Sequence, residues 1–365
     1  MIMPDVPTTM KAWRLDRLGG RLSYDEGPVP DVRPGSVLVK VEASALMTYM
    51  KAYIEGGLPS YHAPDGCFTP GGNCVGIVGK VGKDVWHLRP GQRVLLSSLF
   101  QATENVPDPA RILIGVTSFG GVSETMQADW PNGTLAEYAL LPASAVVPAD
   151  GWDDVAPMRL AAATRFVVPY GGFVRGRLAA GETVIVNGAT GAYGSAAVLL
   201  ALAMGAGRVV AAGRNADKLA ALAERGGRAV VPIALSGDIK ADAEALRTAA
   251  EGSADLAFDM IGGAQDPNST LAALHALRSE GRLVLMGSLM VDLPVPYLQV
   301  MIRSIKLIGN FMHRPGALRN VLALARAGHL DLSAIKPKPF PLADLLPAME
   351  AAATAGSFEQ IVMCP

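Results

Sequence analysis

Apolar residues follow two different patterns along the chain, and the change falls near residue 155. Before it, short valine-rich runs such as 36–44 and 75–82 predict β-strands, and turns rich in proline and glycine, such as 88–94, separate them. Residues 101–132 have no clear hydrophobic period, so we expect an irregular lobe or lid there. The first part of the chain is therefore predicted to be rich in β-structure.

After residue 155, short apolar runs alternate with longer segments of helical character, the first of them at 157–174. Strands that alternate with crossover helices predict a parallel sheet covered on both faces, so the fold class is α/β. The predicted strands are 182–188, 207–214, 254–262, 281–288 and 305–311, and the predicted helices are 195–206, 216–227, 269–281, 317–328 and 342–356.

Length and composition narrow the class of protein. A chain of 365 residues is long for a single core, so two domains are expected. Apolar residues make up 50% and charged residues 18%, which describes a globular protein rather than a disordered one. The formal net charge of −1 gives no general attraction for nucleic acid or an anionic membrane, so a small molecule is the expected partner.

Cysteine usage and the first residues bear on location. The chain has three scattered cysteines, Cys67, Cys74 and Cys364, which are too few for a disulfide framework. Residues 1–13 lack a basic stretch followed by an apolar core, so no signal peptide is expected. The apolar run at 195–206 is too short to span a bilayer. A reducing, cytoplasmic setting is predicted.

A glycine-rich loop lies between a predicted strand and a predicted helix. Backbone N–H groups at a helix N-terminus have no intrahelical acceptor and can bind a pyrophosphate, and glycine lets the backbone approach that anion. The alternative is a plain strand-to-helix turn, which the surrounding β/α units disfavour. The predicted cofactor-binding residues here are Gly188, Ala189, Thr190, Gly191, Ala192, Tyr193 and Gly194.

The end of the second strand indicates which dinucleotide binds. Gly213 stands where a site for NAD would carry an acidic residue for the ribose hydroxyls. Arg214 follows at once and Lys218 comes four residues later, and a guanidinium can bind a 2′-phosphate with two hydrogen bonds. We therefore predict NADP(H) rather than NAD(H). The alternative is that both cations are ordinary solvated charges at a helix start.

Landmarks along nearly the whole chain carry a resemblance to a known family. They are "MKAW", "VLVKVEASAL", "GIVGKVGKDVWHLRPGQRV", "GTLAEYALLPASAVVPA", "LAAGETVIVNGATGAYGSAAVLLA", "AFDMIGG", "GRLVLMG" and "KLIGNF". Together they are more specific than the glycine loop alone. The chain resembles the medium-chain dehydrogenase/reductase superfamily.

The resemblance implies a GroES-like β-barrel catalytic domain over 1–154 and a Rossmann domain, a doubly wound parallel sheet that binds NADP, over 155–310. A C-terminal segment over 311–365 would return to the catalytic domain, and the active site would lie between the two domains. It also implies a homodimer or homotetramer in which the strand at 305–311 pairs across the two-fold axis. Further cofactor contacts would come from Ile261, Gly287, Ser288, Asn310 and Phe311.

The chain departs from the zinc-dependent members of this superfamily at each ligand position. Met47 stands at the place of the first cysteine, Gly72 at that of the histidine, and Thr164 near that of the third ligand. These residues cannot form a zinc site of the usual kind. Residues 95–132 contain none of the four cysteines of a structural zinc lobe. The pattern is closer to the zinc-independent quinone, enone and alkenal reductases, and no metal is predicted.

Without a metal, hydrogen-bond donors must stabilise the substrate oxygen during hydride transfer. Tyr49 occupies the place where the zinc branch has a proton-relaying serine or threonine, so it is the preferred donor. The alternative is an aromatic that only packs. Thr48 and Asn73 are secondary donors, and Tyr53 is a further candidate, shifted by one place from a tyrosine of the quinone reductases.

We therefore expect a zinc-independent, NADPH-dependent oxidoreductase that acts on a small or medium apolar ketone, quinone or activated alkene. Two alternatives remain open: a reversible alcohol dehydrogenase or ketone reductase, and an NADPH-binding sensor or structural protein without turnover. Soft and aromatic side chains are expected to line an apolar pocket. They are Met47, Met50, Phe100, Phe311 and Met312.

Overall fold

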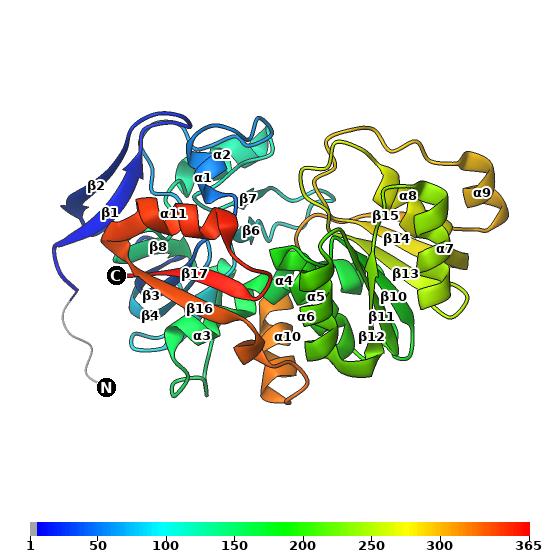
Figure 1. Cartoon of the computed structure of the whole chain (residues 1–365). Helices are drawn as coiled ribbons and strands as arrows, with labels where there is room; N and C mark the ends of the chain where they lie inside the picture. Colours follow the sequence, from blue (N-terminus) through cyan, green and yellow to red (C-terminus); the bar gives the residue numbers. More distant parts are fainter. Residues whose placement is uncertain (1–5) are drawn as a thin grey trace. The chain divides into compact units, whose positions relative to one another are not determined.

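The computed structural model describes residues 6–365 and divides into two compact units (Figure 1). The first unit comprises residues up to Thr164 together with Leu332–Ala355 and Glu359–Pro365. The second comprises Arg165–Asp331 and Gly356–Phe358. The backbone therefore passes four times from one unit to the other.

A seven-stranded, largely antiparallel sheet forms the core of the first unit. Its order is β16-β17-β3-β4-β5-β9, with β8 also paired to β3. Alternate valines of β3, such as Val37, Val39 and Val41, are buried in one apolar cluster, which explains the valine-rich pattern of this strand. The strands are β3 (Ser36–Ala45), β4 (Cys74–Val81), β5 (Arg93–Leu96), β8 (Tyr138–Pro142), β9 (Val146–Pro148), β16 (Lys336–Pro341) and β17 (Glu359–Cys364).

Smaller elements complete the first unit. A hairpin of β1 (Thr9–Leu15) and β2 (Leu22–Pro28) precedes the sheet. The α-helices are α1 (Met50–Ile54), α2 (Val122–Asp129), α3 (Pro157–Leu160) and α11 (Leu345–Thr354), and short 3-10 helices span Ala143–Ala145, Leu332–Ala334 and Leu342–Asp344.

The segment 101–132 is more regular than its sequence predicts. Two short antiparallel strands, β6 (Leu99–Gln101) and β7 (Arg111–Leu113), pair with each other, and α2 follows. The interpretation as a wholly irregular lobe was therefore wrong. Strands of three residues are too short to show a period of two, which explains why the pattern was not visible.

The second unit is built on a six-stranded, fully parallel sheet of order β12-β11-β10-β13-β14-β15. Successive strands are added on one side of β10 up to β12, and on its other side from β13 to β15, so the strand order switches between β10 and β13. Ligands bind at such a switch point in open sheets of this kind. The strands are β10 (Thr183–Asn187), β11 (Arg208–Gly213), β12 (Val230–Ala234), β13 (Ala254–Asp259), β14 (Leu277–Leu285) and β15 (Lys306–Gly309).

Helices cover both faces of this sheet (Figure 1). Alternation along β10 serves both layers: Ile185 packs in the cluster with α7 and α8, and its neighbours Val184 and Val186 are equally buried. The helices are α4 (Ala163–Arg175), α5 (Ala192–Ala203), α6 (Ala216–Gly226), α7 (Ile239–Ala249), α8 (Asn268–His275), α9 (Tyr297–Ile302) and α10 (Ala317–Arg326), with a 3-10 helix over Gly227–Ala229.

Most strands and helices predicted for this unit are confirmed, and one boundary was wrong. The predicted helix 269–281 ends at His275, and β14 begins at Leu277, where it pairs with Ala254. The pairing of β14 with β13 overrides the helical pattern there. No element was predicted for 228–253, although this segment contains β12 and α7. Pro232 lies in β12, which is at the edge of the sheet, where a proline is tolerated.

The two units do not divide where the sequence placed its boundaries, after 154 and after 310. They divide after Thr164 and after Asp331. The apolar stripe of α10, which includes Leu318, Val321 and Leu322, is buried, and this helix belongs to the second unit. The return to the first unit therefore begins about one helix later than expected.

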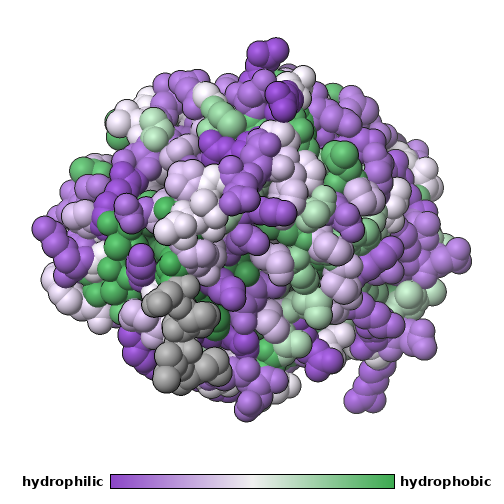
Figure 2. All heavy atoms as spheres, turned by 90° about the vertical axis from the view of Figure 1, so that its left-hand side faces the viewer, coloured by the Kyte–Doolittle hydropathy of each residue, from purple (hydrophilic) through white to green (hydrophobic). Residues whose placement is uncertain are grey.

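The surface and the thiols agree with the overall composition. Figure 2 shows one face on which polar side chains are interspersed with smaller apolar areas. All three cysteines are free thiols; Cys74 is buried, and burial raises its pKa to about 12. Over residues 6–365, no helix combines the length and apolar character needed to cross a membrane.

Candidate active site

The glycine loop after β10 forms a tight strand-to-helix turn. Gly188 has a φ of +81°, a conformation that glycine adopts without strain. A Cβ atom at Gly194 would lie 2.0 Å from the Gly188 carbonyl oxygen, so only glycine fits at that position. The absence of this side chain lets the first turn of α5 pack directly on the loop, as the sequence predicted for a phosphate-binding turn.

The first turn of α5 is suited to an anion. Gly191 is the N-cap residue of α5, and no side chain caps this helix. The first amides of any α-helix have no acceptor within the helix, and the helix dipole adds partial positive charge there. A Cβ atom at Gly191 would have only the Gly188 carbonyl oxygen near it, at 3.5 Å. The residues of this turn therefore fit a dinucleotide phosphate. The predicted contacts of residues 188–194 with the cofactor come from the sequence pattern.

A short segment from much later in the chain supports the loop, and the sequence analysis missed it. The Ser357 hydroxyl donates to the Thr190 carbonyl oxygen at 2.7 Å, and the Ser357 carbonyl oxygen accepts from the Ser195 hydroxyl at 2.6 Å and from Arg165 Nη1 at 3.2 Å. These bonds fix both ends of the turn. No local signal marks Ser357, because its partners are more than 160 residues away in the chain.

The end of β11 presents the residues predicted to select the dinucleotide. Gly213 is buried, whereas Arg214 and Lys218 are exposed. Asn215 caps α6, since its side chain accepts from the Lys218 backbone N–H at 2.9 Å. A Cβ atom at Gly213 would lie 3.0 Å from Thr190 Cγ2, so an acidic side chain could enter only if Thr190 moved. The buried strand end itself thus carries a glycine instead of an acidic residue, and the exposed residues that follow it include the cations Arg214 and Lys218 and the carboxylate of Asp217.

The ends of β13 and β14 come together. Ser288 N–H donates to the Ile261 carbonyl oxygen at 2.7 Å, and a Cβ atom at Gly287 would lie 2.3 Å from that same oxygen. Gly287 therefore allows the two loops to meet at the carboxyl edge of the sheet. Asn310 and Phe311 follow β15 at this edge: the Asn310 side chain donates to the Met312 carbonyl oxygen at 2.9 Å, and Phe311 is 42% exposed.

A buried polar pair underlies this edge, and sequence reasoning missed it. Asn187 and Asp259 end the adjacent strands β10 and β13, and Asn187 Nδ2 donates to Asp259 Oδ1 at 3.0 Å. Burial raises the pKa of Asp259 to about 6, although hydrogen bonds from Ile261, Thr270 and Asn187 act in the opposite direction. The register Asn187↔Asp259 could be inferred only once the strand order was known.

In the first unit, Tyr49 lies between β3 and α1, where its carbonyl oxygen accepts from the Tyr53 N–H at 2.9 Å. Its ring lies 5.7 Å from the ring of Tyr61, centroid to centroid. Burial raises the pKa of Tyr61, and a hydrogen bond from the Tyr49 side chain acts against this rise. Tyr61 is therefore a partner of the predicted donor that the sequence analysis did not single out. Thr48, the adjacent residue, is partly buried.

The other two candidate donors have structural bonds. Tyr53 is fully buried and donates to the Val116 carbonyl oxygen at 2.6 Å, and burial raises its pKa far above the usual range. It therefore holds the lobe after β7 to α1. Asn73 is 8% exposed, and its Oδ1 accepts from the Ser98 N–H at 3.0 Å. Met50, expected to line a pocket, is instead fully buried.

The residues at the expected zinc positions do not fit that metal. A Cβ atom at Gly72 would lie 2.5 Å from Ser98 Cβ and 2.8 Å from the Ile114 carbonyl oxygen, so there is no space for an imidazole. The Thr164 hydroxyl donates to the Ala161 carbonyl oxygen at 2.7 Å, and Met47 offers only a thioether. In the described part of the chain, no three His, Cys, Asp or Glu side chains gather as a metal-ligand group.

Comparison with known families agrees with this two-part architecture. Residues 33–151 match the family described as an alcohol dehydrogenase GroES-like domain, and residues 192–327 match the family described as a zinc-binding dehydrogenase. An alcohol dehydrogenase of Rhizobium meliloti is 30% identical over 327 residues, which cover 88% of this chain and 89% of that protein. The chain belongs to the medium-chain dehydrogenase/reductase superfamily. As a member, it is an oxidoreductase of a family that binds a nicotinamide cofactor.

Other members of the superfamily are similar to a comparable degree. An alcohol dehydrogenase of Moraxella is 29% identical over 87% of this chain and 89% of its own length. A protein of Mus musculus named quinone oxidoreductase-like protein 2 is 28% identical over 60% of this chain and 52% of its own length. The superfamily relatives thus include proteins named for both alcohols and quinones.

Solved structures share the fold of this superfamily member. A thermostable alcohol dehydrogenase of Pyrobaculum aerophilum aligns with a TM-score of 0.77 and 21% identity, covering 98% of this chain and all of that one. A zinc-binding dehydrogenase of Sinorhizobium meliloti, described as putative and bound to NADP, aligns with a TM-score of 0.76 and 20% identity over 98% of this chain and 100% of its own. The predicted fold class, a GroES-like domain and a Rossmann domain, is confirmed.

Proposed function

We propose that this protein is a zinc-independent, NADPH-dependent reductase of small or medium apolar compounds that carry a quinone, an activated alkene or a ketone. The observation that carries the proposal is the residue set at the three ligand positions. Gly72 leaves no room for a ligand side chain, and Met47 supplies a thioether. The Thr164 hydroxyl already donates to the Ala161 carbonyl oxygen. Substrate polarisation therefore has to come from hydrogen-bond donors.

The second unit would hold the cofactor, whose reduced nicotinamide supplies a hydride when bound. The amides of the first turn of α5 and the open space at Gly191 suit the pyrophosphate. Arg214 and Lys218, both exposed, suit a 2′-phosphate, which supports NADPH over NADH. Gly287, Ser288, Asn310 and Phe311 stand at the carboxyl edge of β14 and β15, where the nicotinamide ribose and ring would lie.

Tyr49 would donate the proton that the substrate oxygen, or the atom next to the reduced carbon, takes up after hydride transfer. Its side chain is partly exposed, in contrast to the buried Tyr53. A hydrogen bond between the Tyr49 and Tyr61 side chains would orient the Tyr49 hydroxyl. The proposal requires the two units to bring this hydroxyl to the nicotinamide. Thr48 and Asn73 are the alternative donors, and Asn73 already uses its side-chain oxygen on Ser98.

A second candidate activity is reversible interconversion of an alcohol and a ketone. The observation that favours it is that two relatives that span most of this chain are named alcohol dehydrogenases. Product analysis separates the two activities, because an enone reductase saturates the alkene and leaves the carbonyl group, whereas a ketone reductase does the reverse.

The test is an assay of NADPH oxidation with quinones, enones, alkenals, aldehydes and ketones, with NADH in parallel and with metal analysis of the same preparation. We expect turnover of at least one apolar class, a preference for NADPH, and less than stoichiometric zinc. Stoichiometric zinc that is required for turnover would contradict the proposal. Tight NADPH binding without turnover of any class would favour a cofactor-binding protein.

Tyr49→Phe tests the proton donor. Loss of a general acid lowers kcat/KM by about 10²–10⁴-fold on the best substrate. Tyr53→Phe, four residues later in α1, is the matched control: it loses the bond to the Val116 carbonyl oxygen, so it should lower the melting temperature and leave kcat/KM within a few fold. A Tyr49→Phe enzyme as active as the parent would show that another group donates the proton.

We also propose that the protein forms a homodimer through the edge of the second unit. β15 is the outer strand of its sheet, and α9 beside it exposes Tyr297, Leu298, Met301 and Ile302. Exposed strand edges and apolar patches of this kind favour self-association. Light scattering of the pure protein measures the mass, and Leu298→Asp with Ile302→Asp should give a monomer. A monomeric parent protein would contradict the proposal.

A reducing, cytoplasmic location follows as a proposal from the thiols. All three cysteines are free, and Cys67 is exposed. An exposed thiol is kept reduced in the cytosol. Mass spectrometry of alkylated protein from its native cells should find all three thiols unoxidised.

A further inference from the structure

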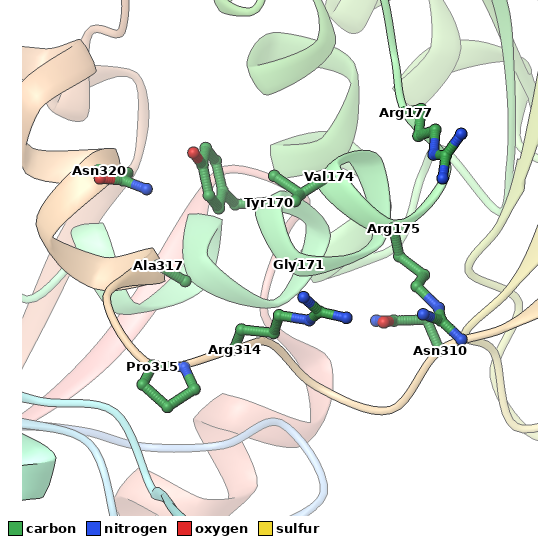
Figure 3. Close-up of a pocket in the computed structure, with 10 residues that line it drawn as sticks. All are labelled: Tyr170, Gly171, Val174, Arg175, Arg177, Asn310, Arg314, Pro315, Ala317 and Asn320. Carbon is green, nitrogen blue, oxygen red and sulfur yellow. The ribbon is translucent and has the colours of Figure 1, made fainter.

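A cavity of about 370 Å³ lies within the second unit, apart from the glycine loop (Figure 3). One wall is the second half of α4, and the other is the segment from β15 to the start of α10. The lining residues are Tyr170, Gly171, Val174, Arg175, Arg177, Asn310, Arg314, Pro315, Ala317 and Asn320.

The charges of this cavity are unbalanced. Three of the lining residues are arginines and none is acidic. Across residues 6–365, no ion pair includes Arg175, Arg177 or Arg314, although nine other cation–carboxylate contacts form. Figure 3 shows the side chains of Arg175 and Arg314 running toward Asn310, whereas that of Arg177 extends away. Two guanidinium groups therefore converge on one end of the cavity.

The walls that carry these two arginines are fixed with respect to each other. A Cβ atom at Gly171 would lie 2.2 Å from the Met312 carbonyl oxygen, so the loop after β15 crosses α4 in direct backbone contact. The Asn310 side chain donates to the same oxygen at 2.9 Å, which stabilises this loop. The cavity is therefore built by the fold and does not depend on the two long side chains.

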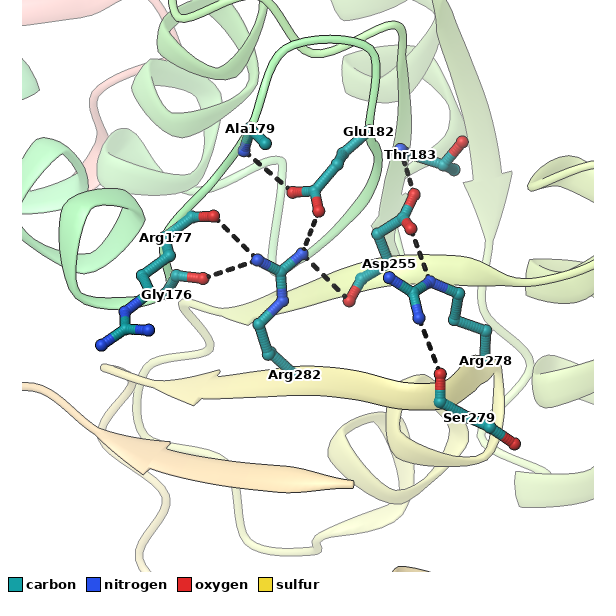
Figure 4. A network of polar contacts seen from close by, with 9 residues as sticks. All are labelled: Gly176, Arg177, Ala179, Glu182, Thr183, Asp255, Arg278, Ser279 and Arg282. Atoms are coloured by element: carbon teal, nitrogen blue, oxygen red, sulfur yellow. Dashed lines mark hydrogen bonds and ion pairs between the residues drawn. The ribbon is translucent and has the colours of Figure 1, made fainter. Parts of the chain in front are cut away.

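The end of α4 is anchored independently (Figure 4). Arg282 Nη1 donates to the carbonyl oxygens of Gly176 and Arg177 at 3.0 and 2.8 Å, and its Nη2 bonds Glu182, which accepts from the Ala179 N–H. Arg282 is satisfied by these partners, whereas Arg175, the residue before Gly176, takes part in none of the ion pairs among the described residues. The contrast indicates that Arg175 is not needed for the fold at this position.

We propose that this cavity binds an organic phosphomonoester, with the phosphate between Arg175 and Arg314. A guanidinium presents its donors in a planar fork that matches two oxygens. A carboxylate is satisfied by one such fork, whereas a phosphomonoester carries about −1.5 to −2 charge at pH 7 and three terminal oxygens, which suit two forks. The volume exceeds that of a phosphate ion, and Val174 and Pro315 offer apolar contact to an organic group.

The far end of the cavity is polar and suits a hydroxyl or carbonyl group on the ligand. Tyr170 and Asn320 lie there, across from the two arginines (Figure 3). The two arginines lie apart from the predicted cofactor phosphates, because Arg175 follows Arg165, which contacts the support of the glycine loop, by ten residues of helix, a rise of about 15 Å. Asn310 is shared, since it lines this cavity and is also a predicted contact of the nicotinamide end of the cofactor. The proposal therefore stands whether or not the protein reduces a substrate.

The experiment is calorimetric titration of the full chain with phenyl phosphate in a low-salt buffer free of phosphate, with inorganic phosphate and benzoate as parallel probes. We expect phenyl phosphate to bind more tightly than either. The double variant Arg175→Ala with Arg314→Ala should weaken binding by about 30-fold or more, since hydrogen bonds to charged groups contribute strongly. Arg177→Ala, which removes one charge from a side chain directed away, should change it less than about 3-fold.

Arg214→Ala separates this site from the cofactor site. If phenyl phosphate binding is lost in that variant and kept in the double variant, the phosphate occupies the dinucleotide site and the proposal is wrong, while the proposed function survives. Equal losses in Arg177→Ala and the double variant would reduce the site to diffuse positive charge. Benzoate binding as tight as that of phenyl phosphate would overturn the phosphate class. Unchanged melting temperatures of the variants establish that they fold.

Discussion

Each unit has a glycine-rich turn, and the missing side chain of a glycine has opposite effects on the space for a ligand in the two turns. At Gly194 the missing side chain lets α5 approach the Gly188 carbonyl oxygen, and the uncapped helix end faces outward for a ligand. At Gly72 the missing side chain lets the turn before β4 pack against Ser98 and the Ile114 carbonyl oxygen, and the space for a ligand side chain is filled by protein. Glycine thus leaves space beside the turn in one unit and lets protein atoms fill that space in the other.

This contrast bears on how a glycine should be interpreted when related proteins have a metal ligand at the same position. A glycine at a ligand position need not be a small change, because the neighbours can close around it. The distances decide: the closest heavy atom to a Cβ at Gly72 is Ser98 Cβ, between β5 and β6, at 2.5 Å, whereas a Cβ at Gly191 has one neighbour, at 3.5 Å. The turn at Gly72 is closed, and the turn at Gly191 is open.

The largest effect is expected for Gly194→Ala. The added Cβ would lie 2.0 Å from the Gly188 carbonyl oxygen, so the loop must move away from the phosphate position. We expect NADPH affinity, measured by fluorescence titration, to fall more than about 100-fold. Gly191→Ala is the matched control, since its φ of −77° suits alanine and its Cβ meets one atom at 3.5 Å; it should lose less than about 10-fold. Equal losses in both variants would remove the contrast within the loop.

The turn in the first unit is tested by Gly72→His combined with Met47→Cys, which restores two ligand types. Because an imidazole must displace Ser98 and the Ile114 backbone, the free energy of unfolding should fall by about 1–3 kcal/mol in urea titration. Zinc content should stay below stoichiometric. Met47→Cys alone controls for the thiol. A double variant that keeps its stability and binds one zinc ion would show that the turn is open after all.

A smaller effect is expected for the two cations that we propose select NADPH. Arg214→Ala with Lys218→Ala removes two exposed cations at the end of β11, so the KM for NADPH should rise about 10-fold. The KM for NADH should change little, because that dinucleotide lacks the 2′-phosphate. Arg208→Ala, which removes one cation from the amino end of the same strand, is the control. Parallel changes for both dinucleotides would assign the two cations to general attraction.

The smallest effect concerns the buried pair beneath the glycine loop. The folded-state pKa of Asp259 is about 6, above its unfolded value, so the folded protein binds the proton more tightly and loses stability as pH rises through 6. Between pH 5 and 7 this loss should be about 1 kcal/mol in the parent. Asp259→Asn cannot ionise, so the stability difference between parent and variant should change by that amount over this range. A constant difference would mean that Asp259 does not titrate over this range in the folded protein.

The fold could be predicted well in the part of the chain where β-strands and α-helices alternate. Strand and helix alternation after residue 155, the glycine loop and Arg214 are local signals, and the structure contains those elements close to their predicted bounds. The predicted roles of the cofactor residues and of Tyr49 stay predictions. Ser357, Tyr61 and the Asn187–Asp259 pair could not be found, because each acts through a partner that only the folded chain brings near. The helix end at His275 was missed because strand pairing decided it.

The chain crossings between the units have a consequence for synthesis on the ribosome. β17 pairs with β3 in the sheet of the first unit, yet more than 300 residues separate the two strands in the chain. The second unit, with only Gly356–Phe358 added from elsewhere, can assemble almost as soon as it emerges, while β3 still waits for its neighbour. During that interval the half-built sheet exposes an edge able to pair with other nascent chains, so translation speed and chaperone supply should govern the yield of this protein.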